Sequence, residues 1–295
     1  MKIRKKRKFQ LFDCVNNTIL VLVSLVCVYP FLYVFFVACS DGAPLALGQV
    51  TFLPKGFQLR SFEYIFQNPR FNVGSGLLNS FLYTIVGTVA ALLVTYVTAF
   101  VLSRKRFVHR HWMMKLFIIT WVFDAGIIPQ YIIYNMFGFV DNPWVMIIPG
   151  AINTQFLIIA RTFLLGIPDE LEEAAFIDGA NDLQLLWRIY LPLSTTILAT
   201  IGTFYAVATW NQYLIPQIYL KSNDLKTIQQ VLKNVVITSG SSDTTFRNVV
   251  VDGVTLNQHN LKSAAIFITI LPIVCVYPFV QKYFKKGILL GSVKG

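Results

Sequence analysis

The sequence predicts an all-α membrane protein with six transmembrane helices, and three observations support this fold class. Of the 295 residues, 55% are hydrophobic and only 13% are charged, whereas soluble domains carry about 25% charged residues. Six apolar segments reach the roughly 20 residues that a helix needs to cross about 30 Å of hydrocarbon. The basic residues gather on alternate connections between these segments, as the positive-inside rule describes.

The predicted spans leave only short polar connections, too short for a soluble catalytic domain. We divide the chain into a basic N-terminus (1–14), a transmembrane domain (15–284) and a tail (285–295). The first apolar run exceeds the 7–15 residues typical of a signal peptide, so we interpret it as an uncleaved helix. The six predicted spans are 15–38, 77–102, 112–135, 143–163, 193–216 and 261–281.

The net charge of +11 is distributed along the membrane edges and does not form a patch for nucleic acid. Seventeen of the 25 Lys and Arg residues lie on one side of the six-span arrangement. They lie at both termini, between the second and third spans, and around the connection between the fourth and fifth spans. The positive-inside rule places these regions, including both termini, in the cytoplasm. We expect a multi-pass protein of a bacterial cell membrane, with lipid and no nucleic acid as a partner.

A few polar residues in the spans are candidates for lining a translocation path. Small and hydroxyl-bearing residues along the second span favour close helix packing. Asp124 is the one acidic residue predicted deep in a span, where a charge costs about 2.5–3.5 kcal/mol and needs a partner or water. The alternative for Asp124 is a hydrogen bond at a helix end. The candidate path residues are Asn79, Asp124, Asn153, Trp210 and Asn211.

The connection 166–192 is acidic and predicts two short helices. Pro168 opens the first helix, and the carboxylates that follow suit the positive end of its macrodipole. Gly179 is placed to end that helix in the left-handed conformation, and Asn181 with Gln184 predicts a capping box for the second. Helical spacing puts four residues of the second helix on one face, namely Leu183, Leu186, Trp187 and Tyr190.

This acidic connection has two interpretations, a solvated hairpin or a surface that docks on a partner protein. Amphipathic helices that bind membranes usually carry basic polar faces. An acidic face suits a basic groove in a protein better than it suits anionic lipid. The spacing of the connection decides between the two, because Glu173-Ala174-Ala175, three residues, Gly179, nine residues and then Ile189-x-Leu191-Pro192 resembles the EAA loop of ABC importer permeases.

Over nearly its whole length the chain resembles the carbohydrate-uptake ABC permeases, on the side of the smaller permease of the maltose transporter. More narrowly, it is similar to permeases that import oligosaccharides released from complex polysaccharides. One departure is Asp124-Ala125-Gly126, where relatives often carry a pair of glycines. The supporting segments are Asn79–Phe81, Ala99–Arg104, Ile128–Tyr131, Pro149–Ala151, Trp210-Asn211 and Gly291–Gly295.

The resemblance implies a type I ABC importer permease fold with cytoplasmic EAA coupling helices. It implies a second homologous permease subunit, two ATPase subunits, an extracytoplasmic solute-binding protein and an oligosaccharide substrate. The outer segment Asp243–Asn257 would meet the binding protein, and Leu186, Trp187, Ile189 and Pro192 would anchor the loop on its own bundle. The implied ATPase-coupling residues are Glu173, Ala174, Ala175, Asp178, Gly179, Leu186, Trp187, Ile189 and Pro192, and the implied tail contacts with the ATPases are Gly291, Ser292, Val293, Lys294 and Gly295.

The chain carries no motif for supplying its own energy or chemistry. It lacks a P-loop and even a Gly-Lys dipeptide, and we expect no catalytic residue, metal site or cofactor. One alternative is an ion-coupled secondary sugar transporter with Asp124 as the coupling site, which the missing internal repeat weakens. Another is an intramembrane enzyme, for which no nucleophile–base pair is evident. The sequence therefore favours a permease subunit driven by separate ATPases.

Overall fold

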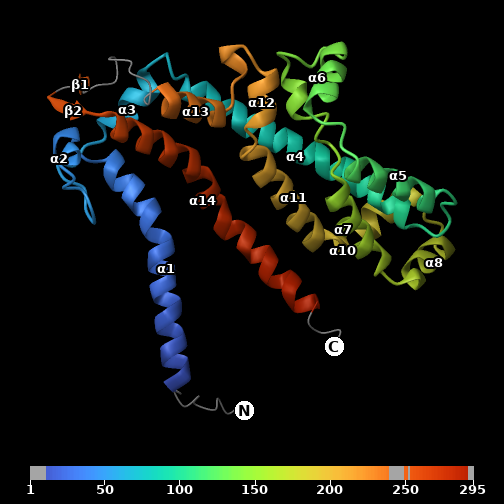
Figure 1. Cartoon of the computed structure of the whole chain (residues 1–295). Coiled ribbons are helices and arrows are strands. Elements are labelled where there is room, and N and C mark those ends of the chain that lie inside the picture. Colours follow the sequence, from blue (N-terminus) through green and yellow to red (C-terminus); the bar gives the residue numbers. More distant parts are fainter. Residues whose placement is uncertain (1–10, 239–248, 252, 292–295) are drawn as a thin grey trace. The chain divides into compact units, whose positions relative to one another are not determined.

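The computed structural model of the chain is almost entirely helical and divides into two compact units. It describes residues 11–238, 249–251 and 253–291 (Figure 1). Unit 1 comprises residues up to Phe71 together with 234–268, and unit 2 comprises 72–233 together with the chain from Thr269 onward.

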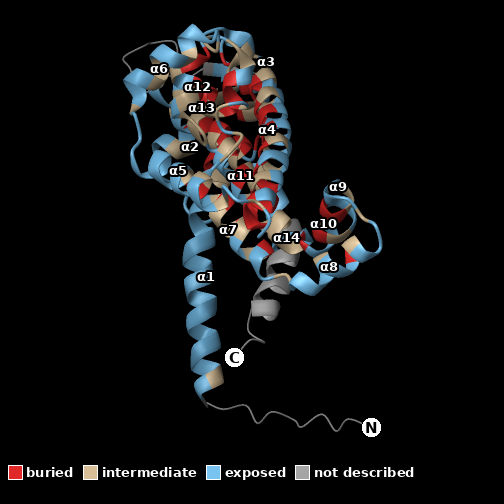
Figure 2. Ribbon diagram, turned by 90° about the vertical axis from the view of Figure 1, so that its right-hand side faces the viewer, coloured by how far each residue is buried: buried red, intermediate tan, exposed pale blue. Residues whose placement is uncertain are grey.

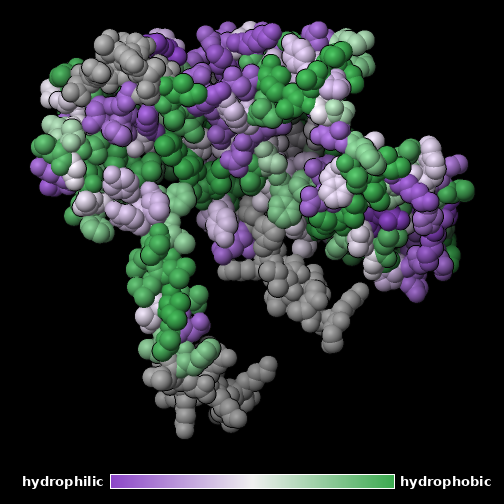
Figure 3. Space-filling model, in the orientation of Figure 1, coloured by the Kyte–Doolittle hydropathy of each residue, from purple (hydrophilic) through white to green (hydrophobic). Residues whose placement is uncertain are grey.

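Unit 1 begins with a long apolar helix. It contains α1 (Leu11–Ala38), α2 (Gly42–Ala46), α3 (Arg60–Gln67), the antiparallel hairpin of β1 (Val249–Val251) and β2 (Val254–Leu256), and the first part of α14 (Gln258–Gly291). Most of α1 is exposed in the isolated chain, although its residues are apolar all round (Figures 2 and 3). A helix with this composition is typical of a membrane span, where lipid or another helix covers it.

A buried asparagine holds the end of α1 against the start of α14. Asn260 is fully buried, and its Nδ2 donates to the carbonyls of Val37 and Ser40, each at 2.8 Å. Its Oδ1 accepts from the backbone N–H of Asn257 at 3.0 Å. These bonds satisfy backbone carbonyls where α1 stops, and such groups are costly to bury unpaired.

Unit 2 is built around α4 (Val73–Ser103), which packs against α7 (Thr154–Leu165) and α11 (Thr195–Trp210) (Figure 1). Small residues let these helices approach closely, as the sequence predicts. A Cβ added at Gly202 would lie 3.0 Å from the Leu92 side chain. A buried polar chain crosses this core, in which Thr95 Oγ1 and the Tyr205 hydroxyl lie 2.7 Å apart and Tyr205 accepts from Asn153 N at 2.9 Å.

Apart from the second part of α14, the other elements of unit 2 are short. Those between α4 and residue 166, besides α7, are α5 (Arg110–Val122), α6 (Ile127–Met136) and η1 (Pro143–Met146). Those that follow α11 are α12 (Leu214–Tyr219), η3 (Asn223–Leu225) and most of α13 (Ile228–Thr238).

The structure confirms three of the six predicted spans as continuous helices of spanning length. By length and composition these are Phe12–Ala38, Val73–Ser103 and Gln258–Pro278, and up to five spans are present if each bent helix pair counts as one. No membrane is included, so the total of six spans stays a prediction.

The other three predicted spans, 112–135, 143–163 and 193–216, are not continuous helices. The first breaks by 115° between α5 and α6, where Gly126 has a φ of +80°. The second holds only a 3-10 turn and α7, and the third ends at Trp210 before α12 begins. Apolar composition predicts burial in lipid, but glycine and proline decide where the helical hydrogen bonds are interrupted.

The segment 221–260, expected from the sequence to be a hydrated connector or a contact for an external partner, contains regular structure. It includes η3, α13 and the β1–β2 hairpin among its described residues. The N-terminus 1–10, part of this segment (239–248 and 252) and the end of the tail (292–295) lie outside the described residues.

We predict that Asn260→Leu destabilises unit 1, because it removes one donor from each of the carbonyls of Val37 and Ser40 and the acceptor of the Asn257 N–H, all in a buried region. The expected loss is about 2–3 kcal/mol, seen as a lower unfolding temperature of the detergent-purified chain. The matched control is Asn234→Leu, which alters an exposed asparagine of the same unit. Equal unfolding temperatures for both variants would contradict the anchoring role of Asn260.

Candidate functional site

The candidate site is the segment 166–192, called the coupling segment below. It consists of α8 (Asp169–Ile177), α9 (Asp182–Gln184), the π-helix η2 (Leu185–Tyr190) and α10 (Leu191–Leu193). A bend of 81° separates the helical run Asp182–Leu193 from α11.

The turn between α8 and α9 forms as the sequence predicts. Gly179 has a φ of +79°, a left-handed conformation that strains residues with a Cβ. Its N–H donates to Phe176 O at 3.0 Å, and Ala180 N donates to Ala175 O at 2.9 Å, which closes the end of α8.

The predicted capping box is also confirmed. The Asn181 side chain accepts from Gln184 N at 2.8 Å, and the Gln184 side chain accepts from Asn181 N at 3.0 Å. Both signals are local, because each depends only on residues within a few positions of each other.

The prediction that Leu183, Leu186, Trp187 and Tyr190 share one face of the second helix is wrong. Leu183 and Trp187 are 66% and 40% exposed, whereas Leu185, Leu186 and Tyr190 are buried. The cause is η2, because a π-helix has more residues per turn than an α-helix and changes which side chains face inward. Leu186 and Ile189 pack in the core as anchors, but Trp187 and Pro192 lie on the surface and do not.

A buried arginine after α4 holds the coupling segment in place. The Arg104 side chain is 9% exposed, and its Nη1 donates to Glu172 Oε2 at 2.6 Å and also to the Tyr190 hydroxyl. Its guanidinium carbon lies 4.2 Å from the centre of the Tyr190 ring and 5.0 Å from that of Phe100. Ser103 Oγ accepts two further hydrogen bonds from Arg104, at 3.2 Å and 3.0 Å. Arg104 therefore contacts α8, η2 and α4 simultaneously.

Two exposed basic residues extend this contact. Arg106 pairs with Asp182 and lies 3.6 Å from Glu172, and its guanidinium covers the Phe176 ring at 4.2 Å. Lys105 pairs with Asp169, and this hydrogen bond lowers the pKa of the Asp169 carboxyl. The Lys105–Asp169 contact is therefore fully present at neutral pH and is lost only as the pH falls through that lowered pKa.

These ion pairs correct the expectation that the acidic residues as a group face a partner. Three carboxylates, Asp169, Glu172 and Asp182, are paired with basic residues of the same chain. Sequence reasoning assigned Arg104, Lys105 and Arg106 only to membrane orientation. The available signal was a basic triplet directly after an apolar helix, followed by six carboxylates in the connection 166–192.

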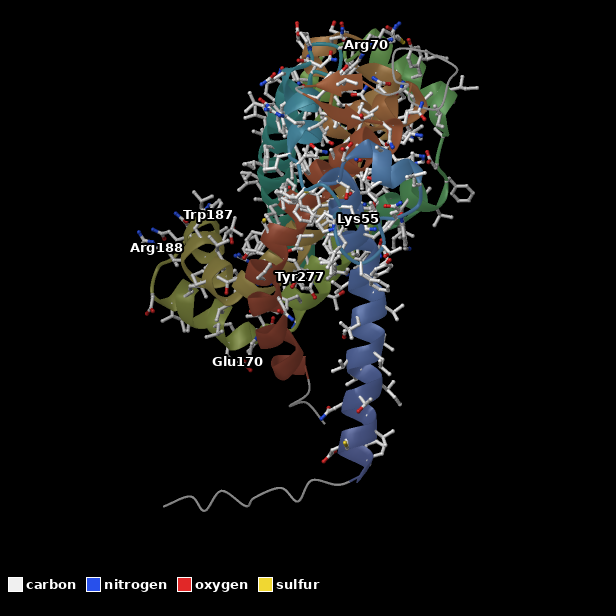
Figure 4. The ribbon with its side chains drawn as sticks, turned by 90° about the vertical axis from the view of Figure 1, so that its left-hand side faces the viewer. Lys55, Arg70, Glu170, Trp187, Arg188 and Tyr277 are labelled. Carbon is white, nitrogen blue, oxygen red and sulfur yellow. The ribbon has the colours of Figure 1, made fainter. Side chains whose placement is uncertain are left out.

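The coupling segment still exposes apolar and acidic side chains together. Glu173 and Ala174 are exposed, whereas Ala175 is buried in the core. Figure 3 shows hydrophilic and hydrophobic patches side by side at this end of unit 2, and in Figure 4 Trp187 and Arg188 project from one edge of the segment and Glu170 lies toward the other. We define the exposed coupling face as Leu171, Glu173, Ala174, Ile177, Asp178, Leu183 and Trp187.

The candidate path residues form hydrogen bonds that hold the chain's own helices and turns in place. Asp124 is exposed in the break between α5 and α6, where its Oδ1 accepts from Gly126 N at 3.0 Å and from Gln130 Nε2 at 2.9 Å. These two bonds are those of the helix-end alternative, and the depth of Asp124 in a membrane stays a prediction. Asn79 Nδ2 donates to the carbonyls of Asp224 at 2.6 Å and Lys226 at 3.1 Å.

The other three candidates also form hydrogen bonds within the chain. Asn153 caps α7 by accepting from Phe156 N at 3.2 Å, and exposed Asn211 donates to Val207 O at 3.0 Å. Trp210 is buried and donates from Nε1 to Thr269 O at 3.3 Å. Within the described part of the chain, no two of the five candidates are joined by a hydrogen bond.

The predicted tail contacts and outer contacts are placed only in part. Gly291 is the last residue of α14, and Ser292, Val293, Lys294 and Gly295 lie outside the described residues. Much of Asp243–Asn257 does as well, apart from the hairpin and Asn257. Among the residues that the structure describes, no group of three or more His, Cys, Asp or Glu residues could hold a metal ion.

Comparisons with known proteins agree on one class. A family profile described as a binding-protein-dependent transport system inner membrane component matches residues 3–289. Protein LplC of Bacillus subtilis is 37% identical and covers 97% of this chain and 96% of its own length. The polygalacturonan/rhamnogalacturonan transport system permease protein YtcP of the same organism is 36% identical and covers 98% and 100%.

A solved structure shares the fold. It is described as the crystal structure of a bacterial ABC transporter involved in the import of the acidic polysaccharide alginate. One of its chains superposes with a TM-score of 0.83 at 30% identity, covering 96% of this chain and 99% of that chain.

We predict that Glu172→Gln lowers the free energy of unfolding by about 2–3 kcal/mol, because it leaves the buried Arg104 guanidinium without a charged partner. Thermal unfolding of the purified chain measures the change. The control is Asp169→Asn, which removes the exposed pair with Lys105 and should leave the unfolding temperature near that of the wild type. A larger effect from Asp169→Asn than from Glu172→Gln would contradict this ranking.

Proposed function

We propose a function for this chain on one premise: it belongs to the family of binding-protein-dependent transport system inner membrane components. We infer that it is the permease subunit of an ATP-driven importer for sugars, with oligosaccharides as the substrate class. It forms half of a translocation path, and a second homologous permease forms the other half. The chain has six spans, and both of its termini lie in the cytoplasm.

The single observation that carries this function is the exposed coupling face. The buried contacts of Arg104 with Glu172 and Tyr190 fix the shape of the coupling segment from within. Its outward side presents apolar residues beside carboxylates, with Ile177 87% exposed. A preformed face of this kind suits a groove in another protein that is apolar at its centre and basic at its rim.

The partner at this face is the ATPase subunit. The chain has no P-loop of its own, so the energy for transport comes from a separate protein that binds ATP. Glu173 pairs with a basic group of that subunit, and Ala174 allows close seating because it is small and exposed. The tail 291–295 reaches the ATPases, and the outer segment 243–257 meets the solute-binding protein.

The relatives indicate the kind of sugar. YtcP is named for polygalacturonan and rhamnogalacturonan, and the solved relative imports alginate, described as an acidic polysaccharide. We propose that this chain takes up oligosaccharides derived from polysaccharides of this type. Ion coupling through Asp124 is not part of the proposal, because that carboxylate is exposed and caps the break before α6.

The function is tested by uptake into proteoliposomes that contain this chain, its partner permease, the ATPase subunits and the binding protein. We predict that short oligogalacturonides accumulate only when ATP is present on the ATPase side. An imposed proton or sodium gradient without ATP should give no accumulation. Uptake driven by either gradient alone would overturn the proposal.

The turn at Gly179 gives a second test. Proline fixes φ near −65°, which is incompatible with the observed +79°, so Gly179→Pro should disrupt the turn. We predict that the variant still inserts into the membrane but no longer co-purifies with the ATPase subunits. Gly150→Ala is the control, because a Cβ at Gly150 meets no atom within 4 Å and its φ is not in the left-handed region. Normal co-purification of Gly179→Pro would count against docking through the coupling face.

A further inference from the structure

We propose that Arg104 is a positioning residue that makes the coupling segment and α4 move as one rigid body. Displacement of the segment by the ATPases is then carried along α4 to the segment 223–228 at its other end. The inference rests on the proposed function and adds to it the element that transmits the motion.

The Arg104 side chain holds two parts of the coupling segment that are far apart in sequence. Arg104 binds Glu172 on α8 and the hydroxyl of Tyr190 at the end of η2. Between these residues lies the turn at Gly179, where φ is +79°. Because one guanidinium contacts both sides of this turn, α8 and η2 cannot rotate independently while both contacts are made.

Burial makes this contact stiffer than its neighbours. The side chains of Arg104 and Glu172 are 9% and 13% exposed, whereas those of Lys105 and Asp169 are 71% and 53% exposed. Exposed pairs are screened by water and salt, and they exchange their geometry easily. A buried charge that loses its partner is not compensated by bulk water, so breaking the contact is costly.

Arg104 also suits its place at the end of α4. It follows Ser103, the last residue of the helix, where the macrodipole favours positive charge. Its bonds to Ser103 Oγ and its stacking on Phe100 fix the guanidinium to the last turn of α4. A displacement of Glu172 is therefore transmitted to α4 itself and not only to the loop that follows it.

The other end of α4 is bonded just as specifically. Asn79 donates to the carbonyls of Asp224 and Lys226, the Tyr83 hydroxyl donates to Leu225 O at 3.2 Å, and Ser80 Oγ accepts from Ile228 N at 2.8 Å. These contacts tie the first turns of α4 to η3 and the start of α13.

Between its two ends, α4 is a single helix of 31 residues without proline. At about 1.5 Å per residue it is roughly 45 Å long, enough to cross a bilayer. A continuous helix that is bonded at both ends transmits displacement. The geometry therefore joins the ATP-driven side of the protein to the segment 223–228 through one element.

The experiment compares assembly, ATP hydrolysis and uptake in the same proteoliposomes, with short oligogalacturonides as the probe. The test variants are Arg104→Lys, which keeps the charge but loses the planar fork, and Tyr190→Phe, which removes only the hydroxyl. The control is Lys105→Met, which alters the exposed pair at the same junction. Because Tyr190→Phe removes a single oxygen atom, it tests the idea even if Arg104→Lys fails to fold.

We expect both test variants to co-purify with the ATPases and to hydrolyse ATP at nearly the wild-type rate. Sugar imported per ATP hydrolysed should fall by about tenfold, within the range reported for residues that carry coupling between sites. Lys105→Met should keep the wild-type ratio. An unchanged ratio in both test variants, or parallel losses of assembly, hydrolysis and uptake, would overturn the proposal.

A second measurement separates this proposal from the proposed function. Spin labels at exposed Ile177 on α8 and exposed Val97 on α4, in a background lacking the native cysteines, report the distance between the segment and the helix. We expect a narrow distribution in the wild type and a clearly broader one in Arg104→Lys and Tyr190→Phe. Equal widths would reject the rigid link even in a system that transports nothing. Broadening without any ATP-driven uptake in the wild type would uphold the link and reject the function.

Discussion

A charged group removed from water must be given partners, and the buried guanidinium of Arg104 imposes this requirement on the end of unit 2 that carries the coupling segment. It draws Glu172 and Tyr190 inward and sits on the rings of Phe100 and Tyr190. The position of the coupling segment against α4 follows from these contacts. Without them, the short helices of the segment, which are marginal in isolation, would be held only by apolar packing and exposed ion pairs.

This requirement also determines which residues are left for a partner. Glu172 and Asp169 lie in the acidic first turns of α8, but both are paired inside the chain. Glu173 points outward beside Ala174 and Ile177, which are exposed. The coupling face therefore consists of the exposed side chains that the ion pairs described above do not use. This explains how a strongly acidic segment comes to expose a mixed apolar and acidic surface.

Predictions from the sequence succeeded where the determining interactions are short in range. The Gly179 turn and the Asn181–Gln184 capping box depend on backbone conformation and neighbouring side chains. They failed where the backbone departs from an ideal helix. The π-helix places Trp187 at the surface, and the break at Gly126 interrupts the helix that the sequence predicts over 112–135. Helical spacing assumes a constant number of residues per turn, and both departures violate that assumption.

The sequence by itself determined that the chain is a helical membrane protein, which family it resembles, and where the coupling segment begins, turns and ends. These follow from composition, from local capping signals and from a motif with fixed spacing. Only the tertiary structure decided which carboxylates are used internally and that α4 is bonded at both ends. Those facts depend on contacts between residues far apart in sequence, such as Arg104 with Glu172 and Asn79 with Asp224. Such pairings are set by packing, which residue type and spacing do not encode.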